Sequence, residues 1–563
     1  MTASLSSLND LLPYRTNQHG ADRALVFLSD RNEEQSSLTY DELHQRSRVL
    51  ARQLATHAVK GERVLLMLPT GSDFAIAFFA CLAAGLIAVP IMPPRRLATR
   101  GSSERILADC GPRLVLTDVA TMAGARADRL KTGGAKWIAI DELVLDASDG
   151  TTLPKVSGSD LAVLQYTSGS TSAPKGVMVT HANLLANLGM ITQVLGSTRR
   201  STYVNWGPLY HDMGLIGDFL EPLYVGALGV LMRPSAFMRR PLNWLHAIHT
   251  YGGEVAGGPN FAYELCVHRF RPELVEGLDL SRWKVAFNGA EPVRAATLEK
   301  FTATFAPYGF DARAHYPCFG MAEATLIIAG GTPDVAPVTH AVSRAGLQCH
   351  RASPPLNQAD ALTVVSCGRA MPGQKIAIVD PATATRLTPL EIGEIWISGP
   401  SITQGYWRNE TATAASFGVR IARDDNVWMR TGDFGFLDEV GELVVTGRIK
   451  EMLIIRGMNH YPQDIEATAQ QSHPALSIHN GVAFTLGQDD RLIIAHEVDR
   501  LHRDDSVYDD IVTAIREAIA TEHELAVHKV LLLRPGALPK TTSGKVQRSL
   551  TRDLWRAGEL ELV

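Results

Sequence analysis

Residues 166–177 hold the side chains of this chain that are best suited to binding phosphate. The string Tyr-Thr-Ser-Gly-Ser-Thr-Ser-Ala-Pro-Lys-Gly-Val places hydroxyl groups, two glycines and one lysine between the apolar segments 161–164 and 177–179. Such a loop can turn backbone N–H groups and hydroxyls toward phosphate oxygens, while the lysine adds a point charge. A Walker P-loop ends in Gly-Lys-Ser/Thr, whereas Lys175 stands between a proline and a glycine. We therefore predict a phosphate-binding loop of another type, rather than a flexible surface loop.

Two further strings offer a histidine and a glycine turn. Residues 206–215, Trp-Gly-Pro-Leu-Tyr-His-Asp-Met-Gly-Leu, surround His211 with aromatic residues and glycine. Taken alone, such a histidine is more often a structural residue than a functional one. Residues 288–292, Asn-Gly-Ala-Glu-Pro, follow an apolar strand expected over 285–287. A glycine at that point permits close approach of the backbone to a flat ring.

Three later strings carry charged side chains. Glu323 lies in Tyr-Pro-Cys-Phe-Gly-Met-Ala-Glu-Ala-Thr, and Mg²⁺ prefers carboxylate oxygen and often bridges to nucleotide phosphates. Asp433, in Thr-Gly-Asp-Phe-Gly, could accept hydrogen bonds from both hydroxyls of a ribose; the alternative is a turn aspartate before a strand. Lys545 lies in Leu-Pro-Lys-Thr-Thr-Ser-Gly-Lys-Val-Gln-Arg. A lysine near a C-terminus is usually a solvated charge, but the proline, serine and glycine around Lys545 favour an ordered loop.

In this order, the strings resemble those of the adenylate-forming enzymes, the superfamily of acyl-CoA synthetases, luciferases and peptide-synthetase adenylation domains. The resemblance is closest to the fatty acyl-AMP ligases. Its most specific parts are Gly-Arg-Ile-Lys-Glu at residues 447–451 and Ile-Ile-Arg-Gly-Met-Asn-His-Tyr-Pro-Gln-Asp-Ile-Glu at residues 454–466. It extends over nearly the whole chain.

The resemblance implies an α/β fold with two domains. A large N-terminal adenylate-forming domain, residues 1–449, would contain wound sheets and a small β-barrel-like part. A smaller, mobile α/β C-terminal domain, residues 450–563, would carry the catalytic lysine. Residues 340–362 suit, in length and position, an insertion that marks the family, restrains the C-terminal domain and disfavours use of CoA; an ordinary surface loop is the alternative.

The resemblance also implies roles for individual residues. Lys545 would bridge the substrate carboxylate and the α-phosphate, His211 would lie beside that carboxylate, and Lys450 would be the hinge. Phe319 stands where the family usually has a tyrosine that stacks on adenine, and it keeps the stacking face. The nucleotide would contact Thr167, Ser168, Gly169, Ser170, Thr171, Lys175, Asn288, Gly289, Ala290, Glu291, Phe319, Gly320, Met321, Asp433 and Arg448. Glu323, with Thr167, would hold Mg²⁺.

The implied reaction is the ATP-dependent activation of a medium- or long-chain fatty acid to an acyl-adenylate, with transfer to the phosphopantetheine thiol of an acyl carrier protein. The first alternative is a conventional acyl-CoA synthetase that uses free CoA, and an alternative of another class is an inactive nucleotide-binding scaffold. A peptide-synthetase adenylation domain should offer an acidic partner for an amino group, and we identify none. The acyl chain is expected to contact Trp206, Leu209, Met213, Met232 and Phe261.

The elements that must position these residues read as short apolar strands alternating with amphipathic helices, the pattern of a wound parallel sheet. Residues 63–91 predict a strand, a helix and a second strand. This βαβ unit explains the charge-free run 74–94 without a membrane span, because prolines at positions 90, 93 and 94 interrupt any continuous helix. Thr39 and Thr180 are expected to cap helices that start after them.

The remaining segments are expected to form either loops or short strands and helices. Loops are expected over 147–160, 330–361 and 422–426. Short strands are expected over 393–398, 434–437 and 442–446, with a hairpin turn at Gly441 between the last two. The C-terminal part is expected to contain strands 453–455, 481–485, 492–498 and 529–533, and helices 462–471 and 506–523.

Composition limits the class of protein. With 563 residues, 45% hydrophobic and 20% charged, the chain is long enough for more than one domain and is not disordered. The net charge of -5 does not indicate the excess of basic residues that is typical of nucleic-acid-binding proteins. The six cysteines are scattered without a Cys-x-x-Cys pair, so we expect buried, reduced thiols rather than a zinc site or disulfides. The first ten residues lack a basic start followed by an apolar core, so we expect no signal peptide and a cytoplasmic location.

Overall fold

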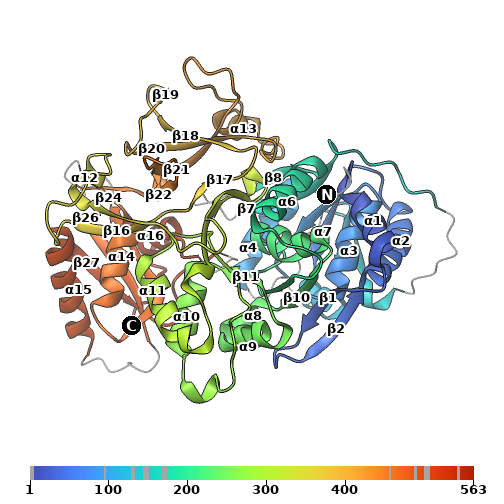
Figure 1. The fold of residues 1–563 in the computed structure, drawn as a ribbon, viewed down its shortest axis with the longest axis horizontal. Coiled ribbons are helices and arrows are strands. Elements are labelled where there is room, and N and C mark those ends of the chain that lie inside the picture. Colours follow the sequence, from blue (N-terminus) through green and yellow to red (C-terminus); the bar gives the residue numbers. More distant parts are fainter. Residues whose placement is uncertain are drawn as a thin grey trace.

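The computed structural model describes residues 5–93, 97–127, 133–143, 151–167, 174–455, 458–486, 491–499, 507–541 and 545–563. Two large sheets with helices between them form the N-terminal part of the chain, and a small antiparallel sheet follows (Figure 1). The last residues, orange to red in Figure 1, form an α/β unit that lies beside α10 and α11. This arrangement confirms the predicted α/β class.

The larger sheet has nine strands in the order β17-β14-β13-β12-β11-β9-β10-β1-β2. These strands are β1 Arg23–Leu28, β2 Glu34–Thr39, β9 Thr202–Asn205, β10 Leu228–Met232, β11 Val255–Gly258, β12 Val285–Asn288, β13 His315–Gly320, β14 Ile327–Gly330 and β17 Arg369–Ala370. The strands from β13 to β1 are parallel. β2 and β14 pair antiparallel with the two ends of this set, and β17 pairs antiparallel with β14. The carboxyl ends of the parallel strands therefore share one edge, where ligands bind in wound sheets.

The second sheet has six strands in the order β6-β5-β3-β4-β7-β8. These are β3 Arg63–Met67, β4 Ile87–Pro90, β5 Leu114–Thr117, β6 Lys136–Ala139, β7 Leu161–Thr167 and β8 Lys175–Thr180. The predicted βαβ unit is confirmed as β3, α3 and β4. The predicted phosphate loop joins β7 to β8, which pair antiparallel. The element that follows β7 is thus an antiparallel strand, whereas a helix follows the strand of a Walker P-loop.

The helices fill the space between the sheets and cover their outer faces. Their bounds are α1 Leu11–His19, α2 Tyr40–Ala55, α3 Ser72–Ala83, α4 Leu97–Cys110, α5 Val119–Ala127, α6 His181–Leu195, α7 Glu221–Val225, α8 Pro234–Arg239, α9 Leu242–Tyr251, α10 Asn260–Arg269, α11 Ala295–Phe305, α12 Arg344–Gln348, α13 Glu410–Ser416, α14 Pro462–Gln471, α15 Tyr508–His523 and α16 Arg548–Ala557. Apolar side chains of α2, α3 and α6 pack between the two sheets, and α8 to α11 cover the other face of the larger one. Thr39 and Thr180 cap α2 and α6 through hydrogen bonds from the backbone N–H groups of Glu42 and Asn183, as predicted.

The small sheet has five antiparallel strands in the order β19-β18-β20-β21-β22. They are β18 Lys375–Asp380, β19 Thr385–Arg386, β20 Gly393–Ser398, β21 Met429–Leu437 and β22 Leu443–Arg448. Here β20 matches its prediction, while β21 begins earlier and β22 ends later than expected. Gly441 has φ +86° between β21 and β22, which supports the predicted hairpin turn.

The segment 330–361 corrects one prediction. We expected a loop there, but the segment contains β15 Thr339–Ser343 and the short helix α12, and it leads into β16 Ala361–Val365. β15 and β16 pair antiparallel across the intervening residues. Pairing between strands so far apart depends on tertiary contacts, so the loop-like composition of this segment concealed it.

The C-terminal unit is built on the sheet β25-β26-β27. Its strands are β23 Leu453–Ile455, β24 Met458–His460, β25 Leu476–Leu486, β26 Arg491–Val498 and β27 Val527–Leu533. All strands and helices predicted here are present, with β24 and α16 in addition. The domain division at residues 449 and 450 and the mobility of the C-terminal unit stay predictions.

Two expectations from composition can be compared with the structure. No helix in the described part of the chain is long and apolar enough to cross a membrane. All six cysteines are free thiols. Four of them are buried as expected, whereas Cys349 is exposed.

Candidate active site

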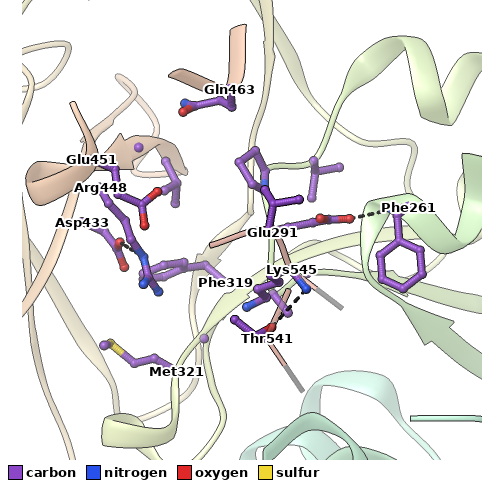
Figure 2. A pocket seen from close by; sticks show the side chains of 18 of the residues that line it. Phe261, Glu291, Phe319, Met321, Asp433, Arg448, Glu451, Gln463, Thr541 and Lys545 are labelled. Atoms are coloured by element: carbon purple, nitrogen blue, oxygen red, sulfur yellow. Dashed lines mark hydrogen bonds and ion pairs between the residues drawn. The ribbon is translucent and has the colours of Figure 1, made fainter. Parts of the chain in front are cut away.

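A cavity of about 2300 Å³ lies among three parts of the molecule. The turn after β12 contributes Glu291, the end of β13 contributes Phe319, the small sheet contributes Asp433 and Arg448, and the C-terminal unit contributes Lys545 (Figure 2). Segments that are far apart in the sequence therefore meet at one site.

Most of the site residues predicted from sequence line this cavity. They are Lys545, His211, Thr167, Lys175, Gly289, Ala290, Glu291, Phe319, Gly320, Met321, Glu323, Asp433, Arg448 and Lys450. Asn288 does not line the cavity. Its side chain is buried and donates a hydrogen bond to Asn260 Oδ1 at 3.4 Å. Ser168, Gly169, Ser170 and Thr171 lie outside the described residues.

His211 is oriented by its neighbour in sequence. The ring Nδ1 lies 2.6 Å from Oδ1 of Asp212, so Nε2, on the opposite side of the ring, points away from this carboxylate. Asp212 is 9% exposed. Burial acts to raise the pKa of Asp212, but His211, Lys545 and the backbone N–H of Met213 outweigh it and hold the pKa below its ordinary value. Asp212 therefore keeps a negative charge beside the histidine, a role that sequence reasoning missed although Asp212 adjoins His211 in the string.

Lys545 reaches the cavity from a turn in the C-terminal unit. The backbone N–H of Lys545 donates a hydrogen bond to Thr541 Oγ1 at 3.1 Å, and the N–H of Thr541 donates to the Lys545 carbonyl at 2.7 Å. Burial and then the positive charge of Arg448 lower the pKa of Lys545, while nearby carboxylates, Asp212 first, oppose this shift. A cation held in this way is placed to attract negative charge that enters the cavity.

Asp433 and Arg448 form a cross-strand pair. They are direct partners in the register of β21 and β22, and Arg448 Nε lies 3.3 Å from Asp433 Oδ1. Burial raises the pKa of Asp433 to about 6, and Arg448 only partly opposes that rise. The carboxylate is therefore fixed on one side by the guanidinium and faces the cavity (Figure 2).

Glu323 has a partner that the sequence did not reveal. Tyr406 Oη donates a hydrogen bond to Glu323 Oε1 at 2.8 Å, and Lys175 Nζ lies 4.5 Å from the centre of the Tyr406 ring. Tyr406 reaches this position because its segment pairs with the edge of β8 through an isolated bridge between Val177 and Tyr406. Burial raises the pKa of Glu323.

The donor set around Glu323 fits a hard cation that takes most of its ligands from elsewhere. Groups of three or more His, Cys, Asp or Glu side chains able to hold a metal are absent from the described residues. Mg²⁺ commonly needs only one or two protein carboxylates, and it takes its other oxygen ligands from phosphates and water.

The turn after β12 has structural roles that the sequence did not show. The Phe261 N–H donates a hydrogen bond to Glu291 Oε1 at 2.6 Å. A Cβ added at Gly289 would lie 2.8 Å from Cys318 Sγ. The backbone at Gly289 therefore lies close to the neighbouring strand β13, which is one reason for a glycine at this position. Ala290 adopts φ +67°, a conformation that few side-chain-bearing residues adopt.

An apolar arm of the cavity runs along one face of the larger sheet. The lining residues of β9, β11, β12 and β13 form successive rows: Gly289 and Cys318 near the carboxyl edge, then Phe287 and Tyr316, and then Tyr203, Val255 and Val285. Ile191 and Leu195 of α6 also line the arm. From Gly289 to Val285 the arm extends roughly 13 Å, at about 3.3 Å per residue.

The position of this arm corrects the predicted acyl contacts. Met213 and Phe261 line the cavity, but Trp206, Leu209 and Met232 do not. Trp206 and Met232 belong to the core on the α8–α11 side, where Trp206 stacks on Phe237 with ring centres 3.9 Å apart. Successive side chains of a strand point to opposite faces, and these two residues lie on the face away from the arm.

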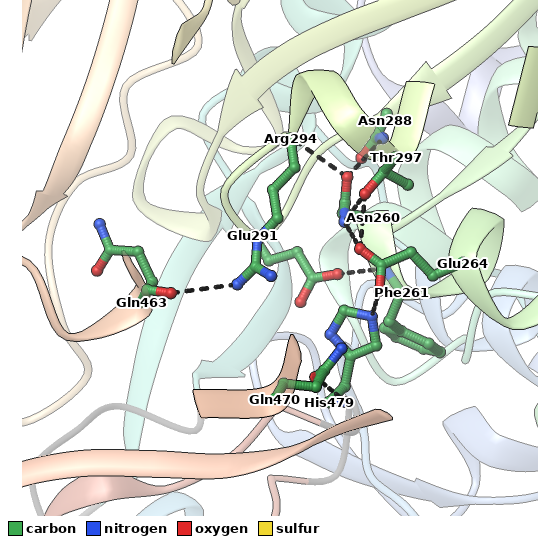
Figure 3. A network of polar contacts seen from close by, with 10 residues as sticks. All are labelled: Asn260, Phe261, Glu264, Asn288, Glu291, Arg294, Thr297, Gln463, Gln470 and His479. Carbon is green, nitrogen blue, oxygen red and sulfur yellow. Dashed lines mark hydrogen bonds and ion pairs between the residues drawn. The ribbon is translucent and has the colours of Figure 1, made fainter. Parts of the chain in front are cut away.

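A polar network holds the C-terminal unit against the rest of the chain (Figure 3). His479 Nε2 lies 2.5 Å from Oε2 of Glu264, and Arg294 Nη2 donates a hydrogen bond to the Gln463 carbonyl at 3.4 Å. Thr297 Oγ1 donates to Glu264 Oε1 at 2.6 Å. Burial acts to raise the pKa of Glu264, but His479 and Thr297 outweigh it and lower the pKa to about 2. This docking is what brings Lys545 to the cavity.

Comparison with known proteins identifies two family models along the chain. Residues 12–407 match the model described as AMP-binding enzyme. Residues 450–563 match the AMP domain described as Disco-interacting protein 2-like.

Similar relatives and solved structures span the whole chain. A medium-chain-fatty-acid–[acyl-carrier-protein] ligase, JamA of Moorena producens, is 41% identical over 99% of this chain and 96% of its own length. The corresponding ligase TtuA of Teredinibacter turnerae is 34% identical over 94% and 90%. A structure from a study of fatty acyl-adenylate ligases of E. coli and L. pneumophila has a TM-score of 0.90 at 33% identity, covering 99% of both chains. The L. pneumophila fatty acyl-adenylate ligase in complex with acyl adenylate and pyrophosphate has a TM-score of 0.79 at 38% identity, covering 99% of this chain and 97% of that one.

The docking network predicts a loss of contact when its central charge is removed. In Glu264→Gln, His479 loses its charged partner, and docking should weaken by about 1.5–3 kcal/mol, the worth of a hydrogen bond to a charged group. Faster amide hydrogen exchange in α10 and β25 would report the change. Glu276→Gln, at an exposed carboxylate, is the matched control. Unchanged exchange in Glu264→Gln would show that the pair does not hold the unit in place.

Proposed function

This chain belongs to the AMP-binding enzyme family, and we propose that it uses ATP to activate a medium- or long-chain fatty acid as an acyl-adenylate. The acyl group then passes to the phosphopantetheine thiol of an acyl carrier protein. The observation that carries this proposal is the meeting of Lys545, the His211–Asp212 pair and the Asp433–Arg448 pair in one cavity with an apolar arm.

In the first step, a carboxylate oxygen attacks the α-phosphorus of ATP. The bond from that phosphorus to the bridging oxygen of the β-phosphate breaks, and pyrophosphate leaves. Lys545 stabilises the negative charge between the carboxylate and the α-phosphate, and His211, oriented by Asp212, lies beside the carboxylate. Both groups act by position and charge and form no covalent bond.

The remaining cavity residues bind the nucleotide. Asp433 accepts hydrogen bonds from the ribose hydroxyls, with Arg448 beside it, and Phe319 offers its ring face to adenine. Lys175 and Thr167, which line the cavity on either side of residues 168–173, contact the phosphates. Glu323, held by Tyr406, would supply a carboxylate oxygen to Mg²⁺, which neutralises phosphate charge when it is bound.

The apolar arm receives the hydrocarbon chain. Its entrance adjoins Gly289 and Cys318 at the carboxyl edge of the sheet, so a substrate carboxylate near His211 would send its chain along the sheet face toward Val255 and Val285. The length of the arm suits a medium-length chain.

In the second step, the thiol sulfur of the carrier attacks the acyl carbon, and AMP leaves. We infer that residues 340–362 favour the carrier over free CoA by restraining the C-terminal unit. Asn459 Nδ2 donates hydrogen bonds to the Gln348 carbonyl at 3.2 Å and to His350 Nε2 at 2.8 Å. Arg344 Nη2 lies 3.6 Å from Oε2 of Glu522.

Removal of the Lys545 ammonium group tests the adenylation step. Lys545→Ala should lower the rate of pyrophosphate release by about 10²–10³, the loss typical of one preorganised charge-stabilising group, while ATP still binds. Calorimetry would measure binding and a coupled assay would measure pyrophosphate. Lys529→Ala, an exposed lysine of the same unit, is the control. Undiminished release in Lys545→Ala would exclude the assigned role.

Asp433 predicts a pH dependence of ribose binding. Since its pKa is raised to about 6, the carboxylate is ionised above this pH and becomes protonated below it. The affinity for adenosine should therefore fall by up to about tenfold per pH unit below 6. Adenosine avoids the titration of a phosphate, which occurs in the same range. Asp433→Asn should bind adenosine weakly and without this dependence; a flat profile for the unaltered protein from pH 5 to 8 would contradict the assignment.

The acceptor of the acyl group separates this function from its alternatives. Incubation with Mg·ATP and dodecanoate should give acyl-AMP that persists with CoA and is consumed by a holo carrier protein, as followed by mass spectrometry. Arg344→Ala combined with Asn459→Ala should increase acyl-CoA formation, and Arg351→Ala, an exposed residue of the same segment, should not. Rapid acyl-CoA formation by the unaltered protein would identify an acyl-CoA synthetase. No adenylate with any fatty acid would identify an inactive scaffold.

A further inference from the structure

The far end of the apolar arm contains polar side chains that its hydrocarbon lining does not explain. Glu221 and Tyr203 both line the cavity, and they are 0% and 1% exposed. Oε2 of Glu221 and Oη of Tyr203 have no hydrogen-bond partner among the residues that the structure describes, although both atoms are buried. Leaving such groups unpaired in a protein interior is costly, so their presence at the end of a substrate cavity calls for a partner.

Glu221 is fixed in place on one side only. Thr192 Oγ1 of α6 donates a hydrogen bond to Glu221 Oε1 at 2.8 Å, which leaves Oε2 as the free oxygen. Burial raises the pKa of Glu221 to about 8, and the Thr192 hydrogen bond only partly opposes this rise. Among the described residues, Glu221 has no lysine or arginine in an ion pair. The carboxyl group is therefore largely protonated at neutral pH and can donate as well as accept a hydrogen bond.

Tyr203 completes the pair from the sheet side. Burial, and then the charge of Glu221, raise the pKa of the Tyr203 phenol, which shows that the two groups are close enough to interact. The Ser197 hydroxyl lies nearby and opposes this in part, without forming a hydrogen bond of normal geometry. Tyr316 also has a buried hydroxyl, but that hydroxyl is packed against Gly330, where an added Cβ would lie 2.1 Å from it, so it does not belong to the pair.

The pair lies where the end of an acyl chain would lie. Tyr203 occupies the same row of the sheet as Val255 and Val285, roughly 13 Å along the strands from Gly289 at about 3.3 Å per residue. Glu221 begins α7, four positions after Gly217, another residue that lines the cavity. A fatty acid whose carboxylate is at Lys545 and His211 would therefore present its far end to both side chains.

We propose that Glu221 and Tyr203 form a subsite for a hydroxyl group at the far end of the acyl chain, so that the preferred substrate is a medium-length fatty acid with a terminal hydroxyl. A hydroxyl both donates and accepts a hydrogen bond, and it can pair with Glu221 Oε2 and Tyr203 Oη together. A methyl end would leave both atoms unpaired. This inference rests on the proposed function, because it assigns the substrate of the same cavity.

The test compares two matched series of substrates. Pyrophosphate release is measured with ω-hydroxy acids and with unsubstituted acids that have the same number of chain atoms, over lengths from hexanoate to tetradecanoate. At the length that reaches the pair, kcat/KM for the hydroxy acid should exceed that for its unsubstituted match by about tenfold to a hundredfold, because a site built for a hydroxyl rejects the analogue that lacks it.

Variants show whether the pair is responsible. Glu221→Leu and Tyr203→Phe should each reduce or reverse the preference for the hydroxy acid, and Glu221→Gln, which still donates and accepts, should keep it. Thermal unfolding checks that each variant is folded. If Glu221→Leu does not fold, Tyr203→Phe carries the test, because it removes only a single oxygen.

The failure of this inference differs from the failure of the proposed function. Unsubstituted acids favoured at every length, or a preference unchanged in both Glu221→Leu and Tyr203→Phe, would overturn the subsite and leave adenylation intact. No pyrophosphate release with any acid of either series would overturn the proposed function and the subsite with it.

Discussion

The structure depends on two cationic side chains, Lys545 and Arg448, that lie among buried carboxylates where the C-terminal unit meets the rest of the chain. Lys545 comes from the C-terminal unit, Arg448 and Asp433 come from the small sheet, and Asp212 comes from the segment that follows β9. Charges that are removed from water are costly unless opposite charges face them. The cavity therefore has its balance of charge only when the C-terminal unit is docked, and binding a nucleotide with its phosphates would add anions to this balance.

Docking combines polar contacts with apolar ones. The main apolar cluster of the C-terminal unit contains residues of that unit alone, but Tyr461 of the unit packs with Leu347 and Phe434 across the junction. The polar contacts across the junction include the Glu264–His479 pair and the contacts of Asn459 with residues 348 and 350. Interfaces with this polar character between domains allow relative motion more readily than large hydrophobic ones do. The polar contacts at this junction are therefore compatible with the predicted mobility of the C-terminal unit.

The larger sheet separates two environments by the alternation of its side chains. On the α8–α11 face, Trp206 and its aromatic neighbours pack as a solid core. On the α6 face, the rows from Gly289 to Val285 leave an arm that the same strands line with the opposite set of side chains. The larger sheet thus packs a solid core on one face and lines the cavity on the other. The buried pair Tyr203 and Glu221 lies at the end of the arm.

The sequence by itself determined the local features of this protein. The caps at Thr39 and Thr180 and the bounds of β20 and α14 follow from neighbouring residues, and most of the site residues that the motif strings predict line the cavity.

Only the tertiary structure decided what depends on residues distant in the sequence. The Asn288 side chain bonds to Asn260, which begins α10 directly after the neighbouring strand β11. Tyr406 contacts Glu323 because its segment pairs with β8. The strand and helix within residues 330–361 likewise needed a pairing partner that local composition does not reveal. The physical reason is common to all of these: hydrogen-bond partners, the face that a side chain occupies and the burial that shifts a pKa are set by packing, and packing joins residues that the linear order keeps apart.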